Sequence, residues 1–311
     1  MEGNSYEIHL APLQGFTDYI FRNAFEKYFG GVDAYYTPFI RLENGKVRNK
    51  DLRDIQAGLN TVPRLIPQIL PGSSQEFRLL TEIVRDNGYT EIDINLGCPF
   101  PLIAGKRKGA GMLPYPEQVQ EVLQTVNEYP DIRFSLKIRL GWENVCECQF
   151  LSSVFNSVRL DHITVHARTG KQQYKGVVDE EAFARFFEMI RHPLFYNGDI
   201  RCRQDMERIF GKFPVLRGVL IGRGLLSSPL LANEFKRNET FSEEKRMSLC
   251  SDFHEELFFA YSGVLQGESQ LLSRMKALWE YFLPSTDRKI LKKIRKATRL
   301  SQYKECVKWM K

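Results

Sequence analysis

Eight short apolar runs, separated by helix-length segments, constrain the fold of this chain more than any other feature of its sequence. Strands that alternate with helices pair in parallel through right-handed crossovers. Eight such units in roughly 230 residues fit a closed barrel better than an open doubly wound sheet. The runs are IHLAPL (8–13), AYYTPFI (34–40), RLIPQIL (64–70), EIDINLG (91–97), FSLKIRL (134–140), HITVHAR (162–168), LFYNGDI (194–200) and GVLIGRG (218–224).

The segments between these runs carry helix-start signals. Ser73 and Ser74 precede EFRLLTEIVRD, Pro116 precedes EQVQEVLQTV, and Asp179 precedes EEAFARFFEMI. No glycine-rich dinucleotide fingerprint follows the first run, which disfavours a Rossmann fold. We therefore predict an α/β chain with a (β/α)8 TIM barrel.

The strand–helix rhythm ends after a polar connector at 236–240. The following segments FSEEKRMSLCSDFHEELFFAYSGVL and QLLSRMKALWEYFL have helical spacing, and we expect Pro284 to end the second helix. We predict two domains, a barrel over 1–236 and a small C-terminal helical domain over 241–311, with its apolar stripes packed together.

Charge is unevenly distributed along the chain. The net charge is +6, but residues 285–311 hold ten Lys or Arg and two acids, so they carry +8 and residues 1–284 carry −2. A basic module on a nearly neutral body is typical of a surface that binds a polyanion such as nucleic acid. The alternative is the solvated face of an amphipathic helix.

Residues 91–113, EIDINLGCPFPLIAGKRKGAGML, pass from a buried strand to candidate chemistry. The strand delivers Cys98 onto a loop bent by Gly97 and stiffened by Pro99. A glycine-rich basic stretch with Lys106, Arg107 and Lys108 follows. A thiol beside a basic flap suggests an acid or nucleophile that acts on an anionic substrate. The alternative is a buried structural cysteine followed by a solvated turn.

Polar residues recur near the carboxyl ends of the predicted strands, where barrels of this class carry their chemistry. A polar group that points into an apolar barrel is costly unless it meets a partner or a ligand. One such residue can be a satisfied core group, but so many at one rim indicate a site. They are Gln14, Gln68, Asn95, Cys98, Lys137, Arg139, His166, Arg168, Asn197, Asp199 and Arg223.

The last two strands end in Asn197-Gly198-Asp199 and Gly222-Arg223-Gly224. In this architecture the loops after strands seven and eight often bind phosphate, and exposed amides with a guanidinium suit a cofactor phosphate. Lys137 leaves a second possibility open, because a lysine in a barrel can form a Schiff base.

Six scattered cysteines suggest a reduced, cytoplasmic setting. Cys146 and Cys148 have no second pair to complete a metal site, so we expect no metal. The N-terminal residues lack a secretory pattern and no stretch is long enough to cross a bilayer, so we expect no membrane association. We expect a monomer.

Taken together, the motifs APLQGFTD, PQIL, DINLGCP, LKIRLGW, ITVHARTGKQQYKG, NGDI and IGRGLLSSP resemble the tRNA-dihydrouridine synthases. The resemblance extends over the barrel almost end to end, and the basic helical tail is similar too. It implies an enzyme that uses FMN to convert chosen uridines of tRNA to 5,6-dihydrouridine. The reductant of the flavin would be NAD(P)H, and NADPH in particular.

The resemblance also implies residue roles. Cys98 would protonate uracil C5 while hydride from the flavin reaches C6. The residues that would hold FMN are Pro12, Leu13, Gln14, Gln68, Lys137, His166, Asn197, Gly198, Asp199, Gly222 and Arg223, and those that would hold the uracil or the tRNA are Asn95, Arg139, Arg168 and Tyr174.

Two positions depart from the family pattern. Leu13 stands where the family commonly has methionine, which is a tolerable apolar exchange. Pro101 stands where many members have lysine.

Two other functions share some of these features. An FMN barrel that reduces a free pyrimidine or enone would use the same flavin residues, but it leaves the basic tail unexplained. A tRNA-binding protein without catalysis would not need Cys98 and Lys137. We expect removal of residues 241–311 to weaken tRNA binding while sparing flavin binding.

Overall fold

The computed structural model describes residues 6–310 of the chain. Parallel strands form one continuous sheet in the order β5-β2-β1-β11-β10-β9-β8-β7-β6, which curls into a barrel because β5 and β6 are adjacent parts of one run. The predicted TIM barrel is thus confirmed. The strands are β1 (Glu7–Leu10), β2 (Ala34–Tyr36), β5 (Leu65–Ile66), β6 (Gln68–Ile69), β7 (Glu91–Leu96), β8 (Arg133–Gly141), β9 (Ile163–Thr169), β10 (Leu194–Asn197) and β11 (Gly218–Ile221).

The third predicted strand is divided at Pro67 into β5 and β6. Proline has no amide hydrogen to donate to a neighbouring strand. Its carbonyl still accepts from the Asp93 amide at 2.9 Å, so the run pairs with β2 through β5 and with β7 through β6. Eight sequence runs therefore appear as nine strands of one closed barrel.

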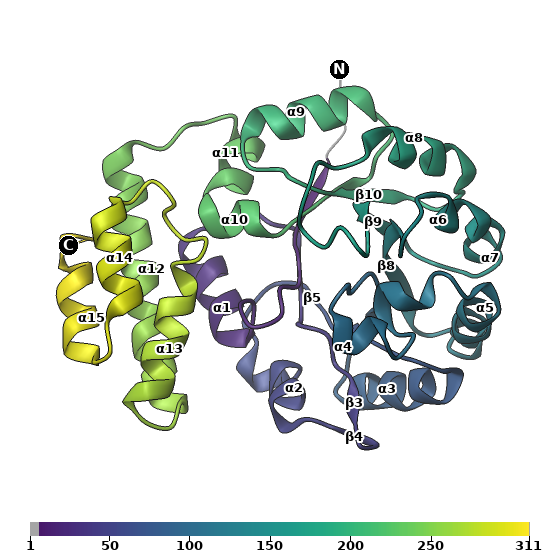
Figure 1. The fold of residues 1–311 in the computed structure, drawn as a ribbon, viewed down its shortest axis with the longest axis horizontal. Coiled ribbons are helices and arrows are strands. Elements are labelled where there is room, and N and C mark those ends of the chain that lie inside the picture. The colour runs from purple at the N-terminus through teal and green to yellow at the C-terminus, as the bar shows by residue number, and fades with distance from the viewer. Residues whose placement is uncertain (1–5, 311) are drawn as a thin grey trace.

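Helices surround the barrel (Figure 1). Two predicted start signals are confirmed, because the Ser73 side chain accepts from the Glu76 amide and the Asp179 side chain accepts from the Ala182 amide. A small hairpin, β3 (Leu42–Glu43) and β4 (Lys46–Val47), follows β2. The helices of this part are α1 (Tyr19–Tyr28), α2 (Asn49–Asp54), α3 (Ser74–Asp86), α4 (Pro101–Ala104), α5 (Pro116–Gln124), α6 (Cys146–Phe150), α7 (Ser152–Asn156), α8 (Glu180–Met189), α9 (Arg203–Lys212), α10 (Arg223–Ser227) and α11 (Leu231–Arg237).

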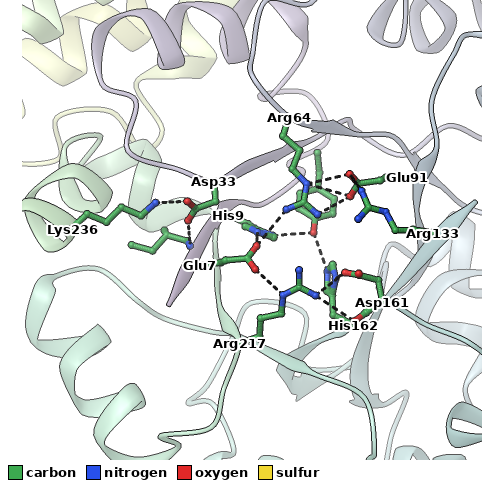
Figure 2. Close-up of polar contacts among 12 residues, drawn as sticks. Glu7, His9, Asp33, Arg64, Glu91, Arg133, Asp161, His162, Arg217 and Lys236 are labelled. Carbon is green, nitrogen blue, oxygen red and sulfur yellow. Dashed lines mark hydrogen bonds and ion pairs between the residues drawn. The ribbon is translucent and has the colours of Figure 1, made fainter. Parts of the chain in front are cut away.

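A ring of polar side chains closes the end of the barrel where the strands begin (Figure 2). Donor–acceptor distances around the ring are 2.7–3.1 Å, and each member bonds to the next. With this end filled, the opposite rim is free to hold a site, as is usual in this architecture. The ring consists of Glu7, His9, Tyr36, His162, Asp161 and Arg217.

The C-terminal region is helical, with α12 (Glu243–Val264), α13 (Glu268–Leu278), α14 (Arg288–Lys296) and α15 (Leu300–Val307) gathered beside α1 (Figure 1). Phe253 on α12 packs against Phe21 and Phe29, with ring centroids 5.5 and 4.9 Å away. These aromatic contacts join the region to the barrel. The division of the chain into two domains at 236–241 remains a prediction. In this connector, Asn238 ends α11 in a left-handed conformation.

The second helix of this region ends earlier than the sequence predicts. Helix α13 stops at Leu278, not at Pro284, and the chain continues in turns. The Trp279 indole donates to the Tyr303 hydroxyl at 2.8 Å, and Phe282 is buried. The Trp279 hydrogen bond and the burial of Phe282 fix these turns, which place Tyr281 at the barrel rim.

Candidate active site

A cavity of about 420 Å³ lies at the carboxyl ends of the barrel strands. It brings together fifteen of the sixteen residues predicted for the site, all except Arg168. They are Pro12, Leu13, Gln14, Gln68, Asn95, Cys98, Lys137, Arg139, His166, Tyr174, Asn197, Gly198, Asp199, Gly222 and Arg223.

Cys98 lies on the loop directly after β7. The Asn95 side-chain oxygen accepts from the amides of Gly97 and Cys98 at 3.0 and 2.9 Å, which fixes this turn. Gly109 packs beneath it with φ of +56°, and a Cβ there would lie 2.8 Å from the Cys98 carbonyl. Burial raises the pKa of the Cys98 thiol above its usual 9.0. The thiol is therefore protonated at neutral pH and is able to act as an acid.

The basic stretch after Cys98 is less free than the sequence suggests. Lys108 is half-buried and forms an ion pair with Glu76 at 2.6 Å. The Arg107 guanidinium lies 4.1 Å from the centre of the Tyr115 ring. Lys108 is therefore not a free cation of this stretch, because it pairs with Glu76 on α3, which is distant in sequence.

Lys137 on β8 lies deep in the protein, yet its side chain is only half-buried because it borders the cavity. Its amine forms no hydrogen bond or ion pair within residues 6–310. Burial and the neighbouring Arg139 lower the pKa of Lys137 to about 8. An amine held this way is suited to a ligand that is an acceptor or an anion.

His166 on β9 is a neutral imidazole. Burial, together with the positive charges of Arg139 and Lys137, holds the pKa of His166 well below its usual 6.5. Its Nε2 lies 3.3 Å from Nη1 of Arg168 and accepts from that guanidinium. Nδ1 is then the nitrogen that carries the imidazole proton.

Arg139 and Arg168 support the loops of the rim. Arg139 donates to the carbonyls of Gly97, Thr169 and Gln173 at 2.6–3.0 Å. Burial lowers the pKa of Arg139 to about 10, so it stays charged at neutral pH.

Arg168 does not line the cavity. It is 1% exposed, pairs with Asp199, and donates to the Gly176 carbonyl at 2.7 Å. The prediction that Arg168 contacts substrate therefore lacks support in the geometry, since its charge is already paired inside the protein.

The loops after β10 and β11 pack against one another. Asn197 donates to the Leu220 carbonyl at 2.7 Å, and a Cβ at Gly224 would lie 1.9 Å from the Ile200 carbonyl. Arg223 bonds to Asp199 at 3.2 Å, and its guanidinium lies 4.7 Å from the centre of the Tyr174 ring. The close backbone approach and the guanidinium at the cavity edge fit an anionic group.

The sequence did not indicate that the C-terminal region contributes to the site. Glu280, Tyr281 and Pro284 line the cavity, and the Tyr281 ring lies 5.3 Å from that of Phe16. The early end of α13 places them there, and helical periodicity gives no signal for such a turn. Other lining residues absent from the prediction are Ala11, Pro38, Phe39, Gly97, Pro99, Ile200, Arg201, Leu220, Ile221, Gly224 and Ser227.

Comparison with known families agrees with this geometry. Residues 9–305 match the family model described as dihydrouridine synthase. The chain belongs to the dihydrouridine synthase family. This membership confirms the resemblance inferred from the sequence motifs.

Individual members of the family are similar to the chain over most of its length. A tRNA-dihydrouridine synthase B from Pasteurella multocida is 27% identical over 252 residues, which covers 80% of this chain and 73% of that protein. A tRNA-dihydrouridine(16) synthase from Pseudomonas syringae pv. tomato is 30% identical over 238 residues, which covers 73% of this chain and 74% of that protein.

Solved structures with a similar fold include morphinone reductase, with a TM-score of 0.56, 10% identity, and coverage of 76% of this chain and 87% of that one. Histamine dehydrogenase from Rhizobium sp. 4-9 has a TM-score of 0.54 and 10% identity, and the match covers 81% of this chain and 48% of that one. At such low identity these likenesses show the barrel fold alone.

Residues 6–310 contain no cluster of three or more His, Cys, Asp or Glu side chains placed to hold a metal ion. No helix within the same residues has the length and apolar character needed to cross a membrane.

Proposed function

We propose that this dihydrouridine synthase family member reduces the C5=C6 bond of specific uridines in tRNA to 5,6-dihydrouridine, with FMN as its cofactor. One observation supports the chemistry most directly: a protonated, half-buried thiol at Cys98 borders the same cavity as the unpaired amine of Lys137. The pair supplies a proton donor and a cationic group to one ligand space.

The cavity fits FMN in its charge pattern. Lys137 has no acceptor among the described residues, and a half-buried amine in this desolvated position is costly without a ligand. The residues that would hold the flavin ring are Pro12, Leu13, Gln14, Gln68 and Lys137. The rim formed by His166, Asn197, Gly198, Asp199, Gly222 and Arg223 would hold the ribityl phosphate. When bound, FMN supplies the hydride that adds to uracil C6.

Cys98 completes the reduction. Hydride addition at C6 places an electron pair at C5, and the S–H bond of Cys98 breaks as its proton passes to C5. The resulting thiolate recovers a proton from solvent. Lys137 would hold the electron-rich edge of the flavin, because an ammonium in a dry site interacts strongly with negative charge. An NAD(P)H reductant, NADPH in our proposal, restores the two electrons.

The C-terminal region would hold tRNA. The basic side chains of α14 are exposed, while Ile294 on the same helix is buried. Such a surface neutralises phosphates and holds the rest of the tRNA while one uracil is extruded into the cavity. The cavity residues that would contact the uracil or the tRNA are Asn95, Arg139 and Tyr174. Tyr174 is 49% exposed, so its ring is open to such a contact. We further propose a monomer in the cytoplasm.

A reductase of a free pyrimidine or enone is the second candidate. It would use the same cavity, but it gives no reason for the exposed basic face of α14.

The test is incubation of purified protein, FMN and NADPH with tRNA that lacks dihydrouridine, followed by nucleoside mass spectrometry. The proposal expects FMN to be retained and some uridines to gain two hydrogen atoms. Reduction of free uracil with no change in tRNA would favour the second candidate. Failure to bind FMN would contradict both.

A further inference from the structure

We propose that Asp93 is a positioning residue for Cys98. Its buried carboxylate is the fixed acceptor that orients the side-chain amides of Gln68 and Asn95, and these amides hold the loop that carries the thiol. This inference rests on the proposed function, in which Cys98 is the proton donor.

The contacts form one continuous chain of hydrogen bonds. Asn95 Nδ2 donates to Gln68 Oε1 at 2.6 Å, and Gln68 Nε2 donates to Asp93 Oδ2 at 2.6 Å. Ser135 Oγ donates to the other oxygen, Asp93 Oδ1, also at 2.6 Å. Asp93 and Gln68 are each 1% exposed and Asn95 is 7% exposed, so water competes little for these groups.

We call this chain of hydrogen bonds from Asn95 through Gln68 to Asp93 the relay. The donor-to-acceptor direction of the relay is fixed from both ends. The amides of Gly97 and Cys98 can only donate, so they require the oxygen of Asn95 to face them. Both carboxylate oxygens of Asp93 accept, one from Ser135 and one from Gln68, so the nitrogen of Gln68 faces Asp93. Both requirements give the same orientation for the two amides, and flipping either one places like groups face to face.

Asp93 is an unusual residue to bury for packing alone. It has no ion pair within the described chain, and a buried carboxylate without a cation is costly. Burial raises the pKa of Asp93, and the hydrogen bonds from Ser135 and Gln68 oppose that rise by stabilising the carboxylate. The sheet register also places Asp93 opposite both Gln68 and Ser135. The register therefore places the carboxylate within reach of both donors.

The relay keeps one more hydrogen on each amide nitrogen, because Gln68 and Asn95 each use one N–H in it. Both residues border the cavity. Asp93 thus makes them donors toward a ligand as well as supports for Cys98, although Asp93 itself does not line the cavity.

Reversing the groups at two positions tests the direction of the relay. In Gln68→Glu, two carboxylates face each other across the 68–93 contact, and their repulsion displaces the side chain at position 68 to which Asn95 donates. Adding Asp93→Asn places an amide nitrogen opposite the new carboxylate at position 68, while the amide oxygen still accepts from Ser135. The total charge then equals that of the wild type. Asp93→Asn alone is tolerated, since its amide can present oxygen to Gln68 and nitrogen to the Ser135 hydroxyl.

The measurement is hydrogen exchange of the Gly97 and Cys98 amides in protein without flavin or tRNA. We expect Gln68→Glu to accelerate their exchange by at least about tenfold, and both Asp93→Asn and the double variant to stay within about threefold of wild type. Asn156→Asp is a matched control, because Asn156 bonds to the Met189 carbonyl far from the relay.

A double variant that exchanges as fast as Gln68→Glu, or a Gln68→Glu protein with wild-type exchange, would overturn the proposal. If Gln68→Glu does not fold, a folded and protected double variant supports the relay and an unfolded one contradicts it. The result is separable from the proposed function, since exchange needs neither cofactor nor tRNA. If wild-type protein does not reduce uridine in tRNA, the proposed function is contradicted. The hydrogen-exchange result for the relay would still stand.

Discussion

At the scale of single residues, the cavity combines groups whose ionisation is set by burial. Burial raises the pKa of the Cys98 thiol and lowers that of Lys137 to about 8. The thiol thus keeps its proton at neutral pH, and a large fraction of the amine remains charged. A protonated thiol and a charged amine at one cavity suit the reduction of a double bond, whereas nucleophilic attack by Cys98 would need its thiolate.

Flavin affinity is expected to fall as pH rises through about 8 in wild-type protein, because Lys137 loses its charge there. Lys137→Arg should move this loss to higher pH, since a guanidinium keeps its proton. Lys137→Met should weaken FMN binding by about tenfold at pH 7. Fluorescence titration of FMN from about pH 6.5 to 9.5 checks these outcomes. An identical pH dependence in the Met variant would refute the assignment of Lys137.

At the scale of elements, the strands were the most predictable part of the chain. All eight apolar runs form barrel strands, because parallel strands buried on both faces produce short, nearly continuous apolar sequences. The rim residues could be predicted too, since the ends of parallel strands converge. The tertiary partners of individual side chains could not be predicted from the sequence. The pairing of Lys108 with Glu76, the burial of Arg168 beside Asp199, and the turn that carries Tyr281 each depend on contacts between distant segments.

The ring at the start of the strands predicts how stability depends on pH. Burial lowers the pKa of His9 to about 4, and a hydrogen bond from His9 lowers that of Glu7 to about 2. The unfolded chain therefore binds more protons than the folded one between about pH 6.5 and 2, so stability falls as pH falls. His9 alone should contribute about 3 kcal/mol to this loss.

Urea unfolding at several pH values measures this effect. His9→Gln should flatten the slope between about pH 6.5 and 4. Equal slopes in wild type and His9→Gln would show that the ring does not control acid stability.

At the scale of the whole molecule, the helical region and the barrel share one site. Arg274 on α13 donates to the carbonyls of Gly15 and Phe16 and pairs with Asp18 at 2.6 Å. These residues follow Gln14, which lines the cavity. Removing residues 241–311 is therefore expected to disturb flavin binding as well as tRNA binding, because the region supports the loop that follows Gln14.

Arg274→Ala should weaken FMN binding by about tenfold or more, because it removes charge-assisted hydrogen bonds that hold this loop. Arg288→Ala, on the exposed face of α14, should weaken tRNA binding and lower its salt dependence without changing FMN affinity. FMN and tRNA titrations of both variants check the pair. Wild-type FMN affinity in Arg274→Ala would mean that the helical region acts only on tRNA.

The most direct test of the central claim is single-turnover reduction of tRNA by pre-reduced wild-type protein and by Cys98→Ala. We predict equal FMN content in the two proteins and a fall of about 10²–10⁴-fold in the rate of dihydrouridine formation by the variant, because it has no proton donor for C5. A Cys98→Ala protein that forms dihydrouridine at the wild-type rate would contradict the account.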